Sequence, residues 1–243
     1  MIRAGEGISA MEFDRLSNRY VPLATAVRAL VAASLGTGAD ADTIHAATSA
    51  IEAVTALLVV EPDAMSVVEP DGGRRPVQRH EVTGRPVVWS NPVVGVRNPL
   101  APPLIVHHES DGHCWSEFTL GDVYEGPPGL VHGGICALVL DQLLGEVATD
   151  QLMTPRFTGT ISVRYLRGTP LGSLRAEAFV DRHDNHKTYA RGFISDARGP
   201  TVEAEGVFIM PAWARDGPGG QERSDMGDGP GGQERSDMEE EGR

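Results

Sequence analysis

The stretch from Gly133 to Gly145, GGICALVLDQLLG, places the strongest constraint on what this chain can fold into. Apolar residues fall on every side of the helix that this stretch predicts, and such a helix is buried by the rest of its domain. Asp141 is its only charged residue, and Gln142 is the only other strongly polar one. Burying an unpaired charge is costly, so a carboxylate there needs hydrogen-bond partners or a chemical role. From this pattern alone the structural and the catalytic interpretations carry equal weight.

Strand patterns surround this helix, which we expect to span residues 134–149. Apolar and polar residues alternate in these runs, and short turns separate them, which predicts an antiparallel sheet. One long helix among six short strands predicts an α+β domain in which a curved sheet wraps around the helix. The predicted strands are Leu104–His108, Cys114–Leu120, Thr158–Tyr165, Ser173–Asp181, Thr188–Ser195 and Thr201–Met210.

Residues 1–60 are Ala-rich and carry two one-face helix patterns, which predict an N-terminal helical hairpin. Gly36, Gly38 and Asp40 separate the two helices, and we expect Asp42 to cap the second one. Each apolar stripe must be covered by the partner helix, by the main domain or by a second subunit. Residues 61–103 are rich in Pro and Gly and predict a linker that wraps the next domain, with one short strand at Val87-Val88-Trp89.

The C-terminal region, 212–243, contains the eleven-residue sequence DGPGGQERSDM twice, starting at Asp216 and at Asp228. It lacks the apolar surface that would offset the entropy of ordering it, so we expect a disordered acidic tail. The domain boundaries predicted from these patterns are therefore 1–60, 61–103, 104–211 and 212–243.

The composition excludes some classes of protein. The chain of 243 residues has a formal net charge of −13 and no basic run, which argues against a nucleic-acid-binding protein. It has no signal-peptide layout at its start and no apolar stretch long enough to span a membrane. Two cysteines, Cys114 and Cys136, fit free thiols in a reducing compartment. We expect a cytoplasmic protein.

The start of the apolar helix suggests a reaction. Val131-His132-Gly133-Gly134 follows a Pro/Gly loop and opens the helix. Two glycines let a ligand approach the backbone, and the free amides of a helix N-terminus favour developing negative charge. Such a site suits the oxyanion of acyl transfer, although an ordinary Gly-rich loop explains a lone HGG as well. Asp141 lies two helical turns further on, on roughly the same face.

The segment GPPGLVHGGICALVLDQLLG resembles the signature of PaaI-type hotdog-fold acyl-CoA thioesterases, members of the thioesterase superfamily. The following run, FTGTISVRYLRGTPLGSLRAEAFV, is similar to the next strands of that family. The resemblance covers roughly residues 100–211. It implies a hotdog fold, a homodimer or tetramer with active sites between subunits, and hydrolysis of acyl-CoA, as in fatty acid metabolism. It implies neither a metal nor a redox cofactor.

The resemblance also implies roles for individual residues. The catalytic carboxylate falls on Asp141, and the amide that polarises the thioester carbonyl falls on Gly133, with Gly134 adjacent. The hydroxyl that positions water falls on Thr158, which would face Asp141 of the partner subunit. Several relatives carry Asn or Gln where this chain has Gly126. Either His132 and the backbone amides suffice here, or catalysis is weaker.

Other interpretations remain open. A hotdog module that binds acyl-CoA without turnover, or that scaffolds a partner, is the main alternative, and an acyl dehydratase on the same fold is a third. Arg182 and Lys187 flank the turn His183–His186 and are candidates to contact the phosphates of coenzyme A, although a solvated turn explains them equally well. A metal site made by His107, His108, His113 and Cys114 is disfavoured, because strand alternation scatters them over both faces.

Overall fold

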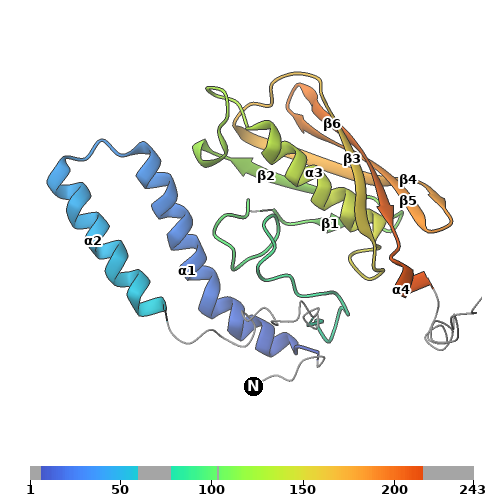
Figure 1. Ribbon diagram of the computed structural model, residues 1–243, viewed down its shortest axis with the longest axis horizontal. Coiled ribbons are helices and arrows are strands. Elements are labelled where there is room, and N and C mark those ends of the chain that lie inside the picture. Colours follow the sequence, from blue (N-terminus) through green and yellow to red (C-terminus); the bar gives the residue numbers. More distant parts are fainter. Residues whose placement is uncertain (1–6, 60–77, 103, 216–243) are drawn as a thin grey trace, which may run out of the picture.

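The computed structural model describes residues 7–59, 78–102 and 104–215, and its centre is an antiparallel sheet with one long helix on one face (Figure 1). The strand order is β1-β2-β4-β5-β6-β3, so β3, which directly follows the helix, is an edge strand. The helix, α3, spans Gly133–Ala148. This is the hotdog fold, and the predicted α+β class is confirmed. The strands are β1 His107–His108, β2 Cys114–Leu120, β3 Phe157–Tyr165, β4 Gly172–Asp184, β5 Lys187–Asp196 and β6 Gly199–Ile209.

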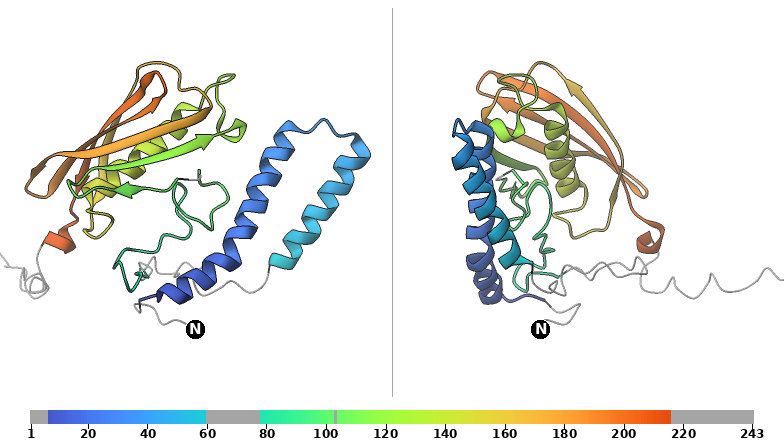
Figure 2. Two further views of the ribbon diagram at one scale, coloured as in Figure 1. Left: turned by 180° about the vertical axis from the view of Figure 1, so that it is seen from behind. Right: turned by 60° about the vertical axis from the view of Figure 1, so that its left-hand side comes forward.

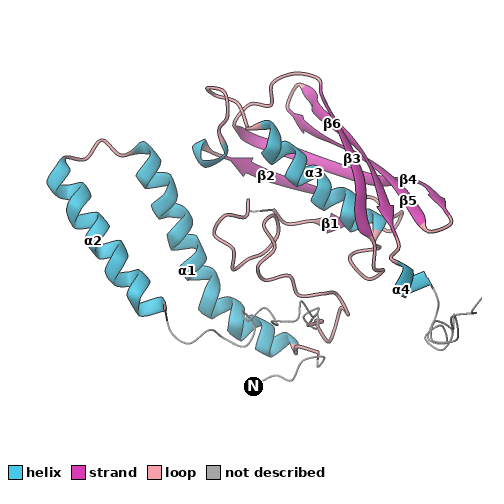
Figure 3. Cartoon of the chain, in the orientation of Figure 1, coloured by secondary structure: helices cyan, strands magenta, loops and turns pink. Residues whose placement is uncertain are grey.

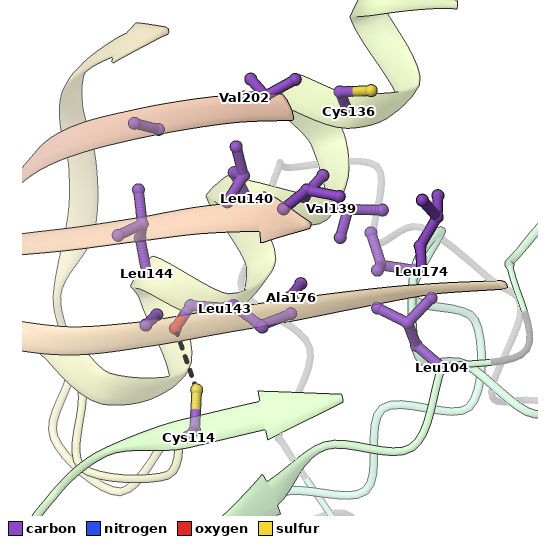
Figure 4. Packing of buried hydrophobic residues seen from close by; sticks show 14 of the residues in the cluster. Leu104, Cys114, Cys136, Val139, Leu140, Leu143, Leu144, Leu174, Ala176 and Val202 are labelled. Atoms are coloured by element: carbon purple, nitrogen blue, oxygen red, sulfur yellow. Dashed lines mark hydrogen bonds between the residues drawn. The ribbon is translucent and has the colours of Figure 1, made fainter. Parts of the chain in front are cut away.

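The core lies between α3 and the concave face of the sheet, where period-two alternation turns every second strand residue inward. On β4, Leu174, Ala176 and Ala178 are buried against the helix, whereas Arg175 and Glu177 lie on the outer face. Figure 4 shows the side chains of α3 packed against those of the sheet. The helix contributes a stripe of fully buried residues: Cys136, Val139, Leu140, Leu143 and Leu144.

The opposite side of α3 is only partly covered, so the expectation of a helix buried on all sides is wrong. Ala137, Leu138 and Asp141 are half-buried there. These half-buried residues lie next to the edge strand β3. Together they form an apolar face with an unpaired strand edge, which is the kind of surface that another protein chain can cover.

The segment 78–102 crosses beside α3 without forming a strand, so the short strand expected at Val87-Val88-Trp89 is absent from this part of the chain. Pro86 makes a single bridge to Arg79, and the Val87 N–H donates to the carbonyl of Gln78 at 2.8 Å. Pro86 and the nearby Pro92 offer no N–H to a ladder, which explains why the pairing stops. The predicted strand at 104–108 is likewise reduced to the two residues of β1.

Two helices precede this segment: α1, Ala10–Gly36, and α2, Ala41–Leu58. The expected helical extension is therefore present, but the expected cap at Asp42 is wrong. Asp40 has the extended backbone of an N-cap, and its side chain accepts from the N–H of Thr43 at 2.8 Å, so Asp42 lies in the first turn.

The two N-terminal helices differ in how they are covered. Helix α1 packs on the segment 78–102, where Phe13 stacks on Trp89 at 4.9 Å and the Arg97 guanidinium lies 3.6 Å from the centre of the Tyr20 ring. Helix α2 lies beyond α1 and farther from the sheet (Figure 2). None of its residues is buried, and its apolar stripe, which includes Ile51 and Val54, stays exposed. Neither the partner helix nor the main domain covers that stripe.

The secondary structure is coloured by type in Figure 3, where the one-turn helix α4, Ala212–Arg215, follows β6. These four residues belong to the segment that we expected to be disordered, and the Arg215 Nε donates to the carbonyl of Met210 at 2.9 Å. The repeated sequence itself lies outside the described residues. In the described ranges, no helix is both long enough and apolar enough to cross a membrane.

Candidate active site

A hydrogen bond joins the two side chains that the sequence singled out for chemistry. The Thr158 Oγ1 donates to the Asp141 Oδ1 at 3.0 Å, from β3 to the middle of α3. Both residues belong to the same chain. The expectation that Thr158 faces Asp141 of a partner subunit is therefore wrong, because the two side chains meet within one chain.

A β-bulge explains why Thr158 reaches the helix. Ile161 and Val163 pack against the core, so strict alternation would turn Thr158 to the outer face of the sheet. The register between β3 and β6 shifts at Gly159, between Thr158 and Thr160, which turns Thr158 inward beside the buried Phe208. A side chain at Gly159 would meet Ile209, with a Cβ only 2.6 Å from its Cδ1, so glycine suits this crowded position.

The N-terminus of α3 leaves one amide free of the helix. His132 is the N-cap, and its Nδ1 accepts from the N–H of Gly134 at 3.0 Å. The Gly134 amide is therefore already engaged by a side chain. Gly133 is the first residue of the helix, where an N–H has no intrahelical acceptor. Of the two amides predicted to act on substrate, the geometry favours Gly133 over Gly134.

Tyr165, at the end of β3, completes this corner of the site, and sequence reasoning missed it. Its Oη donates to the carbonyl of Gly133 at 2.8 Å. Its ring also covers that glycine, because a Cβ on Gly133 would lie 3.2 Å from the Tyr165 ring. The sequence did carry a hint of this position. Ile161, Val163 and Tyr165 are two residues apart, so they face the same side of the strand, towards the helix.

Gly126 has no room for the Asn or Gln side chain that the resemblance led us to expect at this position. A Cβ there would lie 2.8 Å from the His132 Cα and 3.3 Å from its Cδ2. The backbone of His132 cannot yield easily, because its N–H donates to the carbonyl of Tyr124 at 2.9 Å. The imidazole of His132 thus occupies the space beside Gly126.

The candidate groups of one chain do not converge on a single point. Asp141 lies eight residues after Gly133 on α3, which separates them by about 12 Å along the helix axis. A thioester carbon must lie within roughly 3.5 Å of its attacking group. Its oxygen must lie about 3 Å from the oxyanion donor. The chain therefore presents two separate groups of candidate residues, one around Asp141 and Thr158 and one around His132 and Gly133, which we call candidate half-sites.

Arg182 and Lys187 lie at the hairpin between β4 and β5. The Arg182 guanidinium covers the Tyr189 ring at 3.6 Å, and its Nη1 lies 2.9 Å from the Asp181 carboxylate. Lys187 pairs with Ile209, which pairs with Phe157 beside Thr158. Lys187 thus lies at the same end of the sheet as Thr158. Strand β6 lies between their strands, so the backbones of β5 and β3 are about 10 Å apart there. The turn predicted at 183–186 is present, with Asn185 at a φ of 51°.

The histidines and cysteines near β1 and β2 point to separate partners. His107 stacks on Trp115 at 4.2 Å, His108 lies 3.3 Å from Glu146, and His113 lies 3.4 Å from Glu177. Burial raises the pKa of Cys114 to about 12, and it also raises the pKa of Cys136. Both thiols are buried and unpaired, which suits inert core residues rather than nucleophiles.

Comparison with solved structures decides the family. A thioesterase superfamily protein in the solved structures is 30% identical to this chain, with a TM-score of 0.65, and the match covers 90% of that protein. The chain belongs to the thioesterase superfamily. The match also covers 78% of the chain described here. Residues 104–215 make up a smaller share than that, so the similarity extends into the segments before the sheet.

Two other solved structures match less than half of this thioesterase superfamily member. A phenylacetic acid degradation-related protein from Ralstonia eutropha is 21% identical and matches 44% of this chain and 84% of its own, with a TM-score of 0.41. A Bacillus halodurans protein with CoA is 23% identical and matches 46% of this chain and 76% of its own, also with a TM-score of 0.41. No protein-family model and no curated protein matches the sequence.

Proposed function

We propose that this member of the thioesterase superfamily hydrolyses acyl-CoA thioesters to a free acid and coenzyme A. The observation that carries the proposal is the hydrogen bond from Thr158 to Asp141, on the open side of α3. A carboxylate held by a hydroxyl beside an incompletely covered apolar face is suited to activate water next to an acyl chain. The family membership supports the same class of reaction.

The residues divide the reaction between them. Asp141 takes a proton from water as the water oxygen attacks the thioester carbon, or it attacks directly to give a mixed anhydride that water then hydrolyses. Thr158 fixes the carboxylate and, through it, the direction of attack. The Gly133 N–H and the His132 ring stabilise the negative charge on the carbonyl oxygen. When the tetrahedral intermediate collapses, the carbon–sulfur bond breaks and coenzyme A leaves as the thiolate.

A second copy of the chain completes the site. Each chain holds its two half-sites about 12 Å apart. The edge strand β3 and the half-covered face of α3 lie together, so pairing β3 with β3 of another copy would bring the partner's helix start towards Asp141. We propose a homodimer, or a tetramer of such dimers, as the functional unit. Arg182 and Lys187 remain candidates to contact the phosphates of coenzyme A, and the unpaired thiols fit the cytoplasm.

A non-catalytic module that binds acyl-CoA is the second candidate. The observation that favours it is Gly126, which has no room for the Asn or Gln that the resemblance leads us to expect there. Such a module would bind acyl-CoA at both half-sites and release no thiol.

Thiol release from a panel of short-chain, long-chain and aromatic acyl-CoAs tests the proposal. The wild type should turn over at least one member, and Asp141→Asn should lose nearly all of that activity while keeping its melting temperature and oligomeric state. The matched control is Asp150→Asn, an exposed aspartate just beyond the end of α3. Binding without turnover by the wild type would favour the module, and full activity of Asp141→Asn would refute the mechanism.

A further inference from the structure

The peptide unit between Gly133 and Gly134 is held at both of its polar ends. Its carbonyl accepts the hydroxyl of Tyr165 at 2.8 Å, and its N–H donates to the Nδ1 of His132 at 3.0 Å. Three groups therefore stand in line: a phenol, a peptide and an imidazole. Each donor in this line makes the next one a stronger donor, because hydrogen bonds in a chain polarise one another.

The line of bonds fixes the tautomer of His132. A neutral imidazole carries one proton, and the nitrogen that accepts a hydrogen bond cannot also hold it. Because Nδ1 accepts from Gly134, the proton of the neutral ring resides on Nε2. The exposed imidazole then offers an N–H donor at the start of α3, beside the free amide of Gly133.

Gly126 leaves room for the ring of His132. A Cβ at Gly126 would lie 3.2 Å from the His132 Cβ and 3.3 Å from its Cδ2, so a larger residue there would crowd the imidazole. The Nε2 of His132 is therefore a second donor that the local geometry supplies beside the Gly133 amide.

We infer that Tyr165 is a positioning residue that acts through the Gly133–Gly134 peptide to hold His132 as the second donor to the thioester carbonyl. The inference rests on the proposed hydrolysis and adds a residue to it. Tyr165 need not touch the substrate. Its hydroxyl orients the peptide, the peptide selects the tautomer, and the imidazole presents Nε2–H to the developing oxyanion.

A double-mutant cycle between Tyr165→Phe and His132→Ser tests the inference. Phenylalanine keeps the ring that covers Gly133 and removes only the hydroxyl. Serine keeps an N-cap acceptor for the helix and removes the outward N–H. Tyr165→Phe alone should lower kcat roughly 2- to 10-fold, the loss expected for one hydrogen bond, with KM nearly unchanged. In the His132→Ser background the same change should have no further effect, because the two residues act as one unit.

The control is Tyr124→Phe, which removes another phenol that donates to a backbone carbonyl, that of Leu100 at 3.3 Å. It should leave kcat unchanged. A second readout is the nitrogen NMR spectrum of labelled histidine, with the signals of His132 identified by their loss in His132→Ser. The wild type should show His132 protonated on Nε2, and Tyr165→Phe should shift the ring towards a mixture of tautomers.

The outcomes separate the inference from the proposed function. The role of Tyr165 would be overturned if Tyr165→Phe kept full kcat while Asp141→Asn lost activity. It would also be overturned if Tyr165→Phe lowered kcat by the same factor with His132 present and with His132→Ser. Both outcomes would leave the proposed hydrolysis standing. An Nδ1-protonated His132 in the wild type would overturn the role of Tyr165 as well. Binding of acyl-CoA by the wild type without any thiol release would instead overturn the proposed function, and the role of Tyr165 with it.

Discussion

Gly133 and Asp141 lie eight residues apart on α3, so the proposed oxyanion donor and the proposed carboxylate of one chain are separated by about 12 Å along the helix axis. Their separation follows from helix geometry alone, and no side-chain rotation closes it. Two copies that meet at β3 would each supply one half of every site, which gives a mixed dimer a predictable behaviour.

Asp141→Asn and Gly133→Pro should complement each other in mixed dimers. Proline suits the first position of a helix and removes the Gly133 N–H, so it disables one half-site and leaves the helix intact. In a mixed dimer both defects fall in one site, and the other site is entirely wild type. We expect each variant alone to be inactive and each mixed dimer to recover about half of wild-type kcat, a hypothesis that thiol release after subunit exchange can check.

The control pair is Asp141→Asn with Thr158→Ala, which should not complement. Both residues belong to the same half-site of one chain, so each site of this mixed dimer carries one defect. Gly133→Ala serves as the steric control for proline, since it keeps the N–H and adds only a Cβ against Tyr165. Recovery by the Asp141 and Thr158 pair, or failure of the Gly133 pair despite demonstrated exchange, would contradict the split site.

Gly126→Asn should weaken the fold and should not improve catalysis. The new Cβ would meet the His132 Cα at 2.8 Å, and overpacking of this kind costs roughly 1–3 kcal/mol. Gly129→Asn is the matched control in the same loop, because its surroundings are open and Asn tolerates its positive φ of 74°. Thermal melting and kcat of both variants check this, and a more active Gly126→Asn would show that the loop can rearrange.

Asp196 should make stability depend on pH through its ion pair with Arg167, whose Nη1 donates to the carboxylate at 2.8 Å. The Arg167 guanidinium holds the pKa of Asp196 well below its usual range. A carboxyl whose pKa is lower in the folded state stabilises the fold above its unfolded pKa of about 3.9, and this contribution is lost as the pH falls below that value.

The difference in melting temperature between the wild type and Asp196→Asn should therefore be largest near pH 7 and should shrink steadily below about pH 4. Asp122→Asn, an exposed aspartate at the start of the short 3-10 helix, is the control and should show little difference at any pH. A gap for Asp196→Asn that stays constant from pH 7 to pH 3 would mean that the carboxylate charge is not what stabilises the β5–β6 turn.

Removal of residues 216–243 should leave melting temperature and kcat/KM nearly unchanged. The repeated acidic sequence offers no apolar surface to dock, so its loss removes charge and little else. The cut is placed after Arg215, because that side chain bonds the carbonyl of Met210. A large loss of either quantity in the truncated protein would show that the tail takes part in folding or in catalysis.

The fold was predictable because its signals are local and strong. Alternation along the four later strands and the apolar stretch of α3 each specify an element, and only a curved sheet on a helix buries them all. The segment 78–102 was not predictable to the same degree, because Asn91 and two prolines set its path through individual bonds rather than a repeat. The Asn91 Oδ1, for example, accepts from the N–H of Val93 at 2.7 Å.

The types of residue in the candidate site could be predicted from the sequence, but the contacts between them could not. Asp141, Gly133 and Thr158 could be named as candidates from the motif and the strand after it, whereas the bond between Thr158 and Asp141 of the same chain could not be foreseen. Tyr165 stood in the sequence as the last residue of a strand, and only its bond to Gly133 gives it a place beside the helix start.

The bulge at Gly159 acts as a change of phase within β3. Odd and even positions exchange faces at this point, because the pairing with β6 skips Gly159 and sets Thr158 opposite the buried Phe208. A strand of the same length with regular pairing would turn the hydroxyl out of the site, whereas a strand without Gly159 would keep it inward with no bulge at all. The feature that this strand must keep is therefore the pairing of Thr158 with Phe208, and a copy of the strand in another protein should tolerate the loss of Gly159 better than the loss of that pairing.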